Sequence, residues 1–210
     1  EAIRLVCPAS RIYQASSSEM YGEVKNLPVK ITTPMHPLSP YAISKCAAYW
    51  IIINYRESYG LYASNGILFN HESYLRSPNF FVKKVISNAV ANKDNPDWFL
   101  EVGNIDVKRD FGYSPDYVKA MWLILQNSVP KDFIICSGIS VSLRDIIEYV
   151  FKKLSISKDK IIVKEELYRP VDIKDMYGDN SDAINILKWD YKKSFFEVLD
   201  LLIQEELQSN

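Results

Sequence analysis

Three tyrosine–lysine pairs with a spacing of four residues are the first places where residue type and spacing could do chemistry. They are Tyr21 with Lys25, Tyr41 with Lys45, and Tyr149 with Lys153. On a helix, residues four apart lie on one face, so each lysine ammonium would lie beside its partner's phenol. A neighbouring cation favours the phenolate, which can act as a general base toward a substrate hydroxyl. A solvated lysine beside a half-buried tyrosine has the same spacing, so spacing alone does not identify a functional pair.

The surroundings of Tyr41 separate its pair from the other two. Residues 11–16 are predicted to form a strand that ends in the cluster Ser16-Ser17-Ser18. Ser39-Pro40 provides an N-cap and a first-turn proline, so a helix is predicted from there to Gly60, with Tyr41 at its start. Open α/β sheets bind ligands at the carboxyl ends of their strands. The serine cluster and Tyr41 are therefore expected to face the same substrate oxygen.

The other predicted elements alternate between strands and helices, which is typical of the α/β class. Strands are predicted at 61–69, 98–102 and 133–136, and helices at 79–92, 114–127, 142–154 and 194–208. The last helix begins with Ser194-Phe195-Phe196-Glu197, a capping box in which serine and glutamate satisfy each other's free amides. No internal repeat or low-complexity segment interrupts this order.

Composition excludes several classes of function. A formal net charge of -1 at pH 7 gives no electrostatic case for nucleic acid, which binds basic surfaces. No stretch approaches the roughly 18 apolar residues of a membrane span, and the first residues lack the apolar region of a signal peptide. The 3 dispersed cysteines and 2 histidines suggest neither a disulfide framework nor a zinc site. We therefore expect a cytoplasmic protein that contains no metal and binds neither nucleic acid nor membrane.

Five blocks of the sequence resemble the GDP-mannose 4,6-dehydratase family and occur in that family's order. They are Tyr13-Gln-Ala-Ser-Ser-Ser-Glu-Met-Tyr-Gly22, Ser39-Pro-Tyr-Ala-Ile-Ser-Lys45, Leu68-Phe-Asn-His-Glu-Ser73, Gly103-Asn-Ile-Asp-Val-Lys-Arg-Asp-Phe-Gly112 and Tyr168-Arg-Pro170. The resemblance implies an extended short-chain dehydrogenase fold: a partial Rossmann-like, doubly wound parallel sheet with a smaller α/β substrate-binding lobe. It assigns residues 1–73 and 107–138 to the Rossmann-like domain, and residues 74–106 and 139–210 to the lobe.

The resemblance also implies four catalytic residues. Tyr41 falls on the family's catalytic tyrosine, and Lys45 falls on its lysine partner, which also contacts the cofactor NADP. Ser17 and Glu19 match the family's Ser/Thr-x-Glu. Glu19 is the informative residue, because related sugar epimerases have no acidic residue there, whereas elimination of water needs a base and an acid.

Further residues are implied as ligand contacts. His71 and Arg76 fall where the family contacts NADP, so they join Tyr41 and Lys45 in the predicted cofactor site. The predicted contacts with the substrate's nucleotide and diphosphate are Asn79, Lys84, Arg109 and Arg169. An arginine fork suits phosphate oxygens, which favours the two arginines.

The activity implied is that of an NADP-dependent hydro-lyase that converts GDP-mannose to GDP-4-keto-6-deoxymannose, a precursor of fucose. Tyr41 takes the C4 hydroxyl proton as hydride passes to NADP⁺, Glu19 removes the C5 proton, water leaves C6, and the hydride returns there. The full-length enzyme is expected to be a homo-oligomer. Two alternatives stay open: a dehydratase or epimerase of another nucleotide sugar, and a catalytically silent fragment.

The silent fragment is an alternative because the 7 glycines form no Gly-rich strand-to-helix turn, and the sequence begins with Glu1 rather than Met. In dinucleotide folds such a turn holds the cofactor's pyrophosphate. We therefore expect that the cofactor-binding half of the fold is missing. On its own, the chain is expected to bind NADP(H) no more tightly than about millimolar and to lack dehydratase activity.

Overall fold

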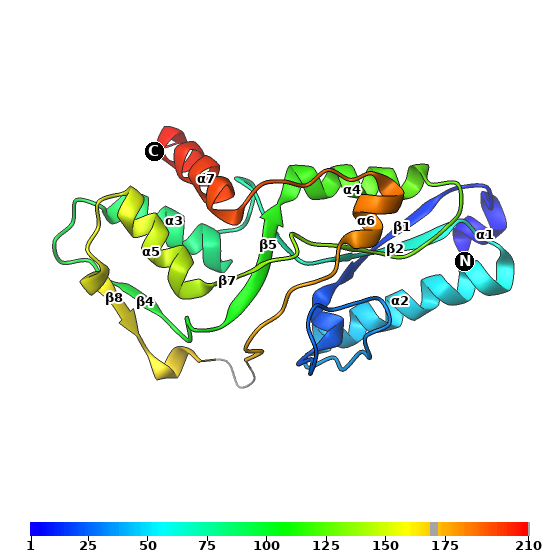
Figure 1. Ribbon diagram of the computed structural model, residues 1–210, viewed down its shortest axis with the longest axis horizontal. Helices are drawn as coiled ribbons and strands as arrows, with labels where there is room; N and C mark the ends of the chain where they lie inside the picture. The colour runs from blue at the N-terminus through cyan, green and yellow to red at the C-terminus, as the bar shows by residue number, and fades with distance from the viewer. Residues whose placement is uncertain (169–171, 210) are drawn as a thin grey trace.

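The computed structural model describes residues 1–168 and 172–209, and at its centre is a parallel sheet of three strands (Figure 1). β1 (Ile12–Ser17) pairs with β2 (Ala63–Leu68), which pairs with β6 (Phe133–Ile135). The register aligns Ser17 with Leu68, so the carboxyl ends of β1 and β2 lie at one edge of the sheet. All three strands lie where the sequence predicts them, which confirms the α/β class.

Two helices cover opposite faces of this sheet. Figure 1 shows β1 and β2 between α2 (Pro40–Tyr59) and α4 (Ser114–Gln126), and both helices pack on these strands. α2 begins as the sequence predicts, because the Ser39 hydroxyl accepts a hydrogen bond from the backbone N–H of Ala42 at 3.1 Å. It ends at Gly60, whose φ of 65° is left-handed and costs glycine little.

A second sheet begins where β2 ends. β3 (Asn70–Glu72) pairs in parallel with β5 (Lys108–Tyr113), which pairs antiparallel with β7 (Ser140–Ser142). The sequence predicts none of these strands. β3 and β7 have three residues each, and β5 begins with three charged residues, so neither length nor β-branched residues mark them as strands.

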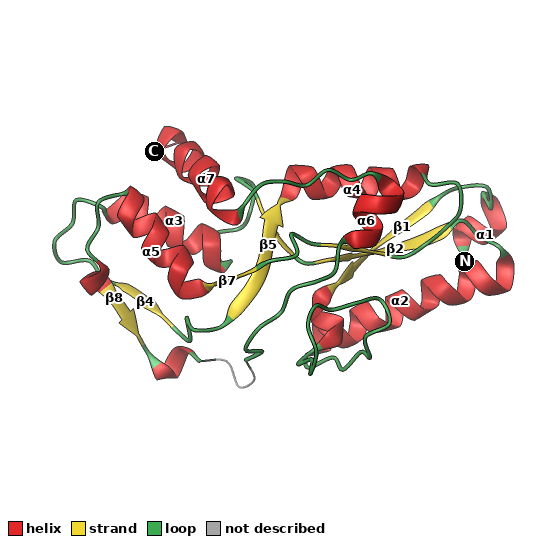
Figure 2. Cartoon of the chain, in the orientation of Figure 1, coloured by secondary structure: helices red, strands yellow, loops and turns green. Residues whose placement is uncertain are grey.

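Three helices and a small sheet form the other end of the molecule (Figure 2). α3 (Phe81–Asn92), α5 (Leu143–Lys153) and α7 (Phe195–Ser209) pack on one another and share one apolar cluster. β4 (Leu100–Val102) pairs in parallel with β8 (Ile161–Val163) beside them. The three helices match their predicted positions, and β8 is a strand that the sequence does not predict.

Short helical segments complete the described structure. They are α1 (Ala2–Val6), α6 (Ser181–Leu187) and the 3-10 helices Ser18–Tyr21, Lys158–Lys160 and Glu165–Leu167. None of the described helices has both the length and the apolar character needed to cross a membrane.

The C-terminal segment 181–189 packs on the three-stranded sheet. α6 lies against α4 and β6, and Leu187 and Trp189 share an apolar cluster with Tyr117 and Phe133. The sequence assigns this segment to the substrate-binding lobe. We propose that the division into domain and lobe holds elsewhere and that residues 181–189 belong with the sheet.

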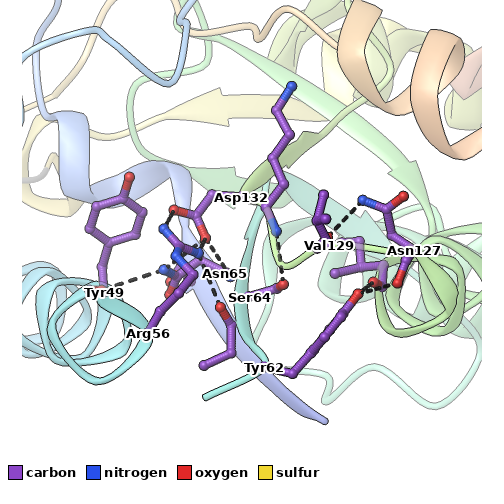
Figure 3. A network of polar contacts seen from close by, with 12 residues as sticks. Tyr49, Arg56, Tyr62, Ser64, Asn65, Asn127, Val129 and Asp132 are labelled. Atoms are coloured by element: carbon purple, nitrogen blue, oxygen red, sulfur yellow. Dashed lines mark hydrogen bonds and ion pairs between the residues drawn. The ribbon is translucent and has the colours of Figure 1, made fainter. Parts of the chain in front are cut away.

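A buried polar network fastens the last turns of α2 to the sheet (Figure 3). Two guanidinium nitrogens of Arg56 donate to the two carboxylate oxygens of Asp132, at 2.7 and 2.9 Å. Asp132 also accepts a hydrogen bond from the backbone N–H of Asn65 in β2, at 2.8 Å. Bidentate charge-assisted contacts are directional, so this network fixes the orientation of the helix whose first turn carries Tyr41.

Candidate active site

Ser17 and Glu19 lie at the carboxyl end of β1. Ser17 is the last residue of the strand, and its hydroxyl accepts a hydrogen bond from the backbone N–H of Glu19 at 3.2 Å. This contact caps the 3-10 helix Ser18–Tyr21, which turns the chain at the edge of the sheet. The Glu19 side chain is thereby placed beyond the ends of the parallel strands.

Tyr41 and Lys45 face this strand end from the first turns of α2. The Lys45 ammonium donates a hydrogen bond to the backbone carbonyl of Ala15 in β1, at 2.9 Å. The same nitrogen lies 5.6 Å from the centre of the Tyr41 ring. Tyr41 remains 54% exposed, so its hydroxyl is accessible to a ligand. Helix and strand therefore bring the predicted Tyr41–Lys45 pair to the same edge as Ser17.

A cavity of about 380 Å³ lies beside this strand end. Five predicted site residues line it: Glu19, Arg76, Asn79, Lys84 and Arg109. Ser17, Tyr41, Lys45 and His71 are not among its described lining residues. Arg169 lies outside the described residues. Glu19 thus connects the two groups of predicted residues, because it follows β1 and also lines the cavity.

One face of the paired strands β3 and β5 forms the floor of the cavity. Asn70 and Glu72 from β3 and Arg109 and Phe111 from β5 all line it, as expected for strands whose alternate side chains point to one face. Asn70 and Glu72 are site residues that the sequence does not predict. The available signal was that these two polar residues are two positions apart directly after a buried strand, which is the spacing of side chains on one face of a strand.

The cations of the cavity are held by different contacts. An Arg109 guanidinium nitrogen donates to the backbone carbonyl of Ile173 at 2.5 Å, so this arginine is oriented by the chain. The Arg76 guanidinium lies over the Phe80 ring, 3.5 Å from its centre. Lys84 is exposed on α3. Together these groups give the cavity a positive wall that suits phosphate oxygens.

Glu72 places a buried carboxyl in the same cavity. It is 3% exposed, and its Oε2 atom lies 3.5 Å from Nε of Arg76. Burial raises the pKa of the Glu72 carboxyl to about 7, and the charge of Arg76 opposes this rise only in part.

His71 lies on the other face of β3. Its ring stacks on Tyr117 of α4, with ring centres 5.1 Å apart, and its Nδ1 is 2.8 Å from the carbonyl oxygen of Phe69. Burial lowers the pKa of His71, which keeps the imidazole neutral at pH 7. His71 and Arg76, both predicted as cofactor contacts, thus reach different faces of the strand, although the charge of Arg76 also lowers the pKa of His71.

Asp110 lies on the face of β5 opposite the cavity and is fully buried. Its carboxylate accepts hydrogen bonds from Ser137 N and Oγ at 2.8 and 2.7 Å, and from Gly138 N at 2.9 Å. It therefore joins β5 to the turn after β6. No group of three histidine, cysteine, aspartate or glutamate side chains in the described part of the chain could hold a metal ion.

The strands, the flanking helices and the ligand-facing edge define the class of Rossmann-like α/β proteins. Two solved structures of similar fold are RMD from Pseudomonas aeruginosa complexed with NADPH and dTDP-glucose 4,6-dehydratase from Bacillus anthracis in complex with NAD. The first has a TM-score of 0.88 and 22% identity, over 96% of this chain and 68% of that one. The second has a TM-score of 0.85 and 21% identity, over 95% and 62%. The Rossmann-like fold expected from the sequence is confirmed.

The chain belongs to the GDP-mannose 4,6 dehydratase family, whose family model matches residues 1–202. The GDP-mannose 4,6 dehydratase of Dictyostelium discoideum is 40% identical over 94% of this chain and 61% of its own length. GDP-mannose 4,6 dehydratase 1 of Arabidopsis thaliana is 41% identical over 95% of this chain and 55% of its own length. The chain therefore spans less than two thirds of the length of these relatives.

Proposed function

We propose that the complete enzyme carrying this chain is a GDP-mannose 4,6-dehydratase, a hydro-lyase that forms GDP-4-keto-6-deoxymannose. The observation that carries this proposal is the position of Glu19. It follows β1 directly after Ser17 and also lines a cavity with cationic side chains. A carboxylate between a tyrosine–lysine pair and a phosphate-binding wall is what elimination of water from a nucleotide sugar requires.

Tyr41 is the proposed base for the C4 hydroxyl. The ammonium of Lys45 lies beside its ring, and Ser17 is proposed to donate a hydrogen bond to the C4 oxygen. A ketone at C4 acidifies the C5 proton, which Glu19 removes as water departs from C6. Each role fits a group at the edge of the sheet that the family resemblance also selects.

The substrate's diphosphate is proposed to lie against the positive wall of the cavity. Lys84 and Arg109 line that wall, Asn79 offers a neutral amide beside them, and Arg169 is proposed to join them. The Arg109 guanidinium is already oriented by the Ile173 carbonyl, which reduces the entropy that phosphate binding would cost.

NADP is the proposed cofactor, and when bound it would accept a hydride and later return it, so that net redox change is zero. The chain's residues fit its nicotinamide end, because Tyr41 is exposed beside the Lys45 ammonium at the ligand-binding edge of the sheet. Lys45, His71 and Arg76 are the proposed contacts. Of these, His71 would have to be reached from the α4 side of β3.

A homo-oligomer in the cytoplasm is also proposed. The cysteines Cys7, Cys46 and Cys136 are free, as in a reducing compartment. Ile43 and Trp50 on α2 are 57% and 59% exposed, and such apolar surface favours association between copies.

The test is an assay of the complete enzyme with GDP-mannose and NADP⁺. Mass spectrometry of the reaction should detect a product that has lost one water. UDP-glucose and dTDP-glucose serve as parallel substrates. Turnover of either of these in place of GDP-mannose would move the enzyme to the alternative nucleotide-sugar dehydratases. No turnover of any of them by the complete enzyme would overturn the proposed activity, whereas the silent-fragment alternative is tested by the same assay on the 210-residue chain alone.

The role of Glu19 is tested separately with Glu19→Gln. C4 oxidation should persist in this variant, because Tyr41 and Lys45 are intact, whereas exchange of the C5 proton with deuterated solvent should be lost. Asp172, another carboxyl that lines the cavity, provides the matched control Asp172→Asn, which should retain exchange. Retained exchange in Glu19→Gln would mean that another group is the base.

A further inference from the structure

Glu72 is a buried carboxyl that has no assigned task in the proposed reaction. It is 3% exposed and lines the cavity, and among the described residues its Oε2 atom has no hydrogen-bond donor. The nearest cation, Nε of Arg76, is 3.5 Å away and also makes no hydrogen bond within the described chain. Buried carboxyl oxygens without partners are costly and rare, so such an atom facing a cavity points to a ligand that supplies the donor.

The position of Glu72 indicates which part of a ligand it meets. Glu72 lies level with Tyr113 of β5, four residues beyond Arg109 on the same face. At about 3.3 Å per residue this places Arg109 about 13 Å away along the strand. Because β1 and β2 are parallel and end together, Glu19 and Glu72 both lie beyond the same edge of the sheet.

The carboxylates Glu19 and Glu72 therefore lie toward one end of the cavity, and Arg109 lies toward the other. We call these the acidic end and the basic end, although at the acidic end Arg76 pairs with Glu72. Carboxylates repel phosphate and attract hydroxyl donors, so a diphosphate is favoured at the basic end and a neutral polyhydroxylated sugar at the acidic end. A nucleotide sugar has both chemistries in this order along its length.

We propose that Glu72 binds the sugar of the nucleotide sugar, with its Oε2 atom accepting a hydrogen bond from a ring hydroxyl. This inference rests on the proposed function. Arg76, held over the Phe80 ring, lies 3.5 Å from the carboxyl and orients it. The pKa of Glu72, raised to about 7 by burial, leaves an acceptor oxygen in both protonation states. Glu72 would thus orient the hexose so that C4 faces Tyr41 and C5 faces Glu19.

The experiment compares binding of GDP-mannose and of GDP by calorimetric titration at pH 8, in the complete enzyme and in Glu72→Gln. A lost hydrogen bond to a charged group should weaken GDP-mannose binding about tenfold, whereas GDP, which has no hexose, should bind within about twofold of the original. Glu206→Gln is the matched control: Glu206 is also a buried glutamate paired with a cation, Lys83, but it does not line the cavity.

The ratio of the two affinities decides the outcome. If Glu72→Gln weakens the binding of GDP and of GDP-mannose equally, or leaves both affinities unchanged, then Glu72 acts only in shaping the cavity and the proposal is overturned. If the unmodified enzyme binds GDP but GDP-mannose gains nothing over it, the proposed substrate itself is wrong, and the inference about Glu72 fails with it.

A second measurement does not depend on the folding of a variant. GDP-mannose analogues that each lack one ring hydroxyl are titrated into the unmodified enzyme. One of them, other than the 4-deoxy analogue whose missing oxygen Tyr41 and Ser17 are proposed to contact, should bind about tenfold more weakly, because the carboxyl oxygen of Glu72 then loses its donor. Equal affinity for every analogue other than the 4-deoxy one would also overturn the proposal.

Discussion

The first turns of α2 and the last turns of α5 carry the same Tyr-x-x-x-Lys spacing in opposite environments. The Tyr149 hydroxyl donates to Asp200, 3.0 Å from each carboxylate oxygen, and Lys153 lies 2.8 Å from the same carboxylate. Tyr41 is 54% exposed, and its hydroxyl has no hydrogen bond in the described part of the chain. In the α5 pair both polar groups contact Asp200, whereas in the α2 pair the tyrosine hydroxyl remains accessible to a ligand.

Two buried carboxyls on neighbouring strands repeat this contrast. Asp110 points away from the cavity and accepts hydrogen bonds from Ser137 and Gly138. Glu72 points into the cavity, and its Oε2 atom lacks a donor among the described residues. In both comparisons, the residue whose polar atoms have hydrogen-bond partners within the fold, Tyr149 or Asp110, is structural. The residue with an unpartnered polar atom, Tyr41 or Glu72, lies at the proposed site.

The largest expected effect comes from Tyr41→Phe in the complete enzyme. Removing the proposed base should lower dehydratase turnover by about 10²–10⁴, the usual contribution of a positioned acid or base. GDP-mannose affinity should remain nearly unchanged, since the phenol acts on the reacting oxygen. Steady-state kinetics and calorimetric titration measure the two quantities.

Tyr149→Phe is the matched control, because it removes the same hydroxyl from the same motif. It should leave turnover within about twofold and lower the free energy of unfolding by about 1 kcal/mol, the usual net contribution of a hydrogen bond. If Tyr149→Phe reduced turnover as strongly as Tyr41→Phe, the assignment of a structural role to Tyr149 and a catalytic role to Tyr41 would be contradicted.

The second prediction concerns stability and contrasts Asp110→Ala with Glu72→Ala. Loss of the Asp110 carboxylate leaves the backbone N–H groups of Ser137 and Gly138 buried without acceptors, so the free energy of unfolding should fall by about 3 kcal/mol. Glu72→Ala removes no hydrogen bond to the described residues and only the 3.5 Å ion pair with Arg76, so it should cost about 1 kcal/mol. Urea denaturation measures both, and equal losses would contradict the assignment of Asp110 as structural and Glu72 as ligand-binding.

Local signals made much of the fold predictable from the sequence. The Ser39 cap, the Gly60 stop and the Ser194–Glu197 capping box all appear as predicted, the last with the Ser194 backbone N–H donating to the Glu197 carboxylate at 2.8 Å. Each of these contacts spans a few residues, so residue type and spacing determine it. The placement of Tyr41 and Lys45 beside β1 is not local, because the contact between Lys45 and Ala15 spans 30 residues. It is expected instead from the rule that α/β sheets bind ligands at the carboxyl ends of their strands.

The cavity could not be predicted in the same way, because its floor depends on pairing between distant segments. Asn70 and Arg109 meet only through the register of β3 and β5, two short strands without a strong strand signal. The sequence named Arg109 through family resemblance and gave no role to Glu72. Tertiary pairing, which has no local signature, also decides that His71 faces α4 while its neighbours face the cavity.

The third prediction is a pH dependence that separates Glu72 from Asp110. The pKa of Glu72 is raised by burial from 4.5 to about 7, so the native state binds its proton more tightly than the unfolded chain does. The contribution of this group to stability is therefore fully present below about pH 4.5 and is lost as pH rises to about 7. Glu72→Gln removes the ionisation, so its stability relative to the unmodified protein should be higher at pH 8 than at pH 5, by about 2 kcal/mol.

The measurement is urea denaturation of both proteins at the two pH values. Burial also raises the pKa of Asp110, to about 6, but Asp110 is present in both proteins, so its own pH dependence cancels in the difference. Arg76 is likewise common to both proteins. A stability difference that does not change between pH 5 and pH 8 would mean that the Glu72 carboxyl is already solvated or paired. Glu72 and Asp110 would then differ only in their hydrogen bonds, and no longer in the pH dependence of stability.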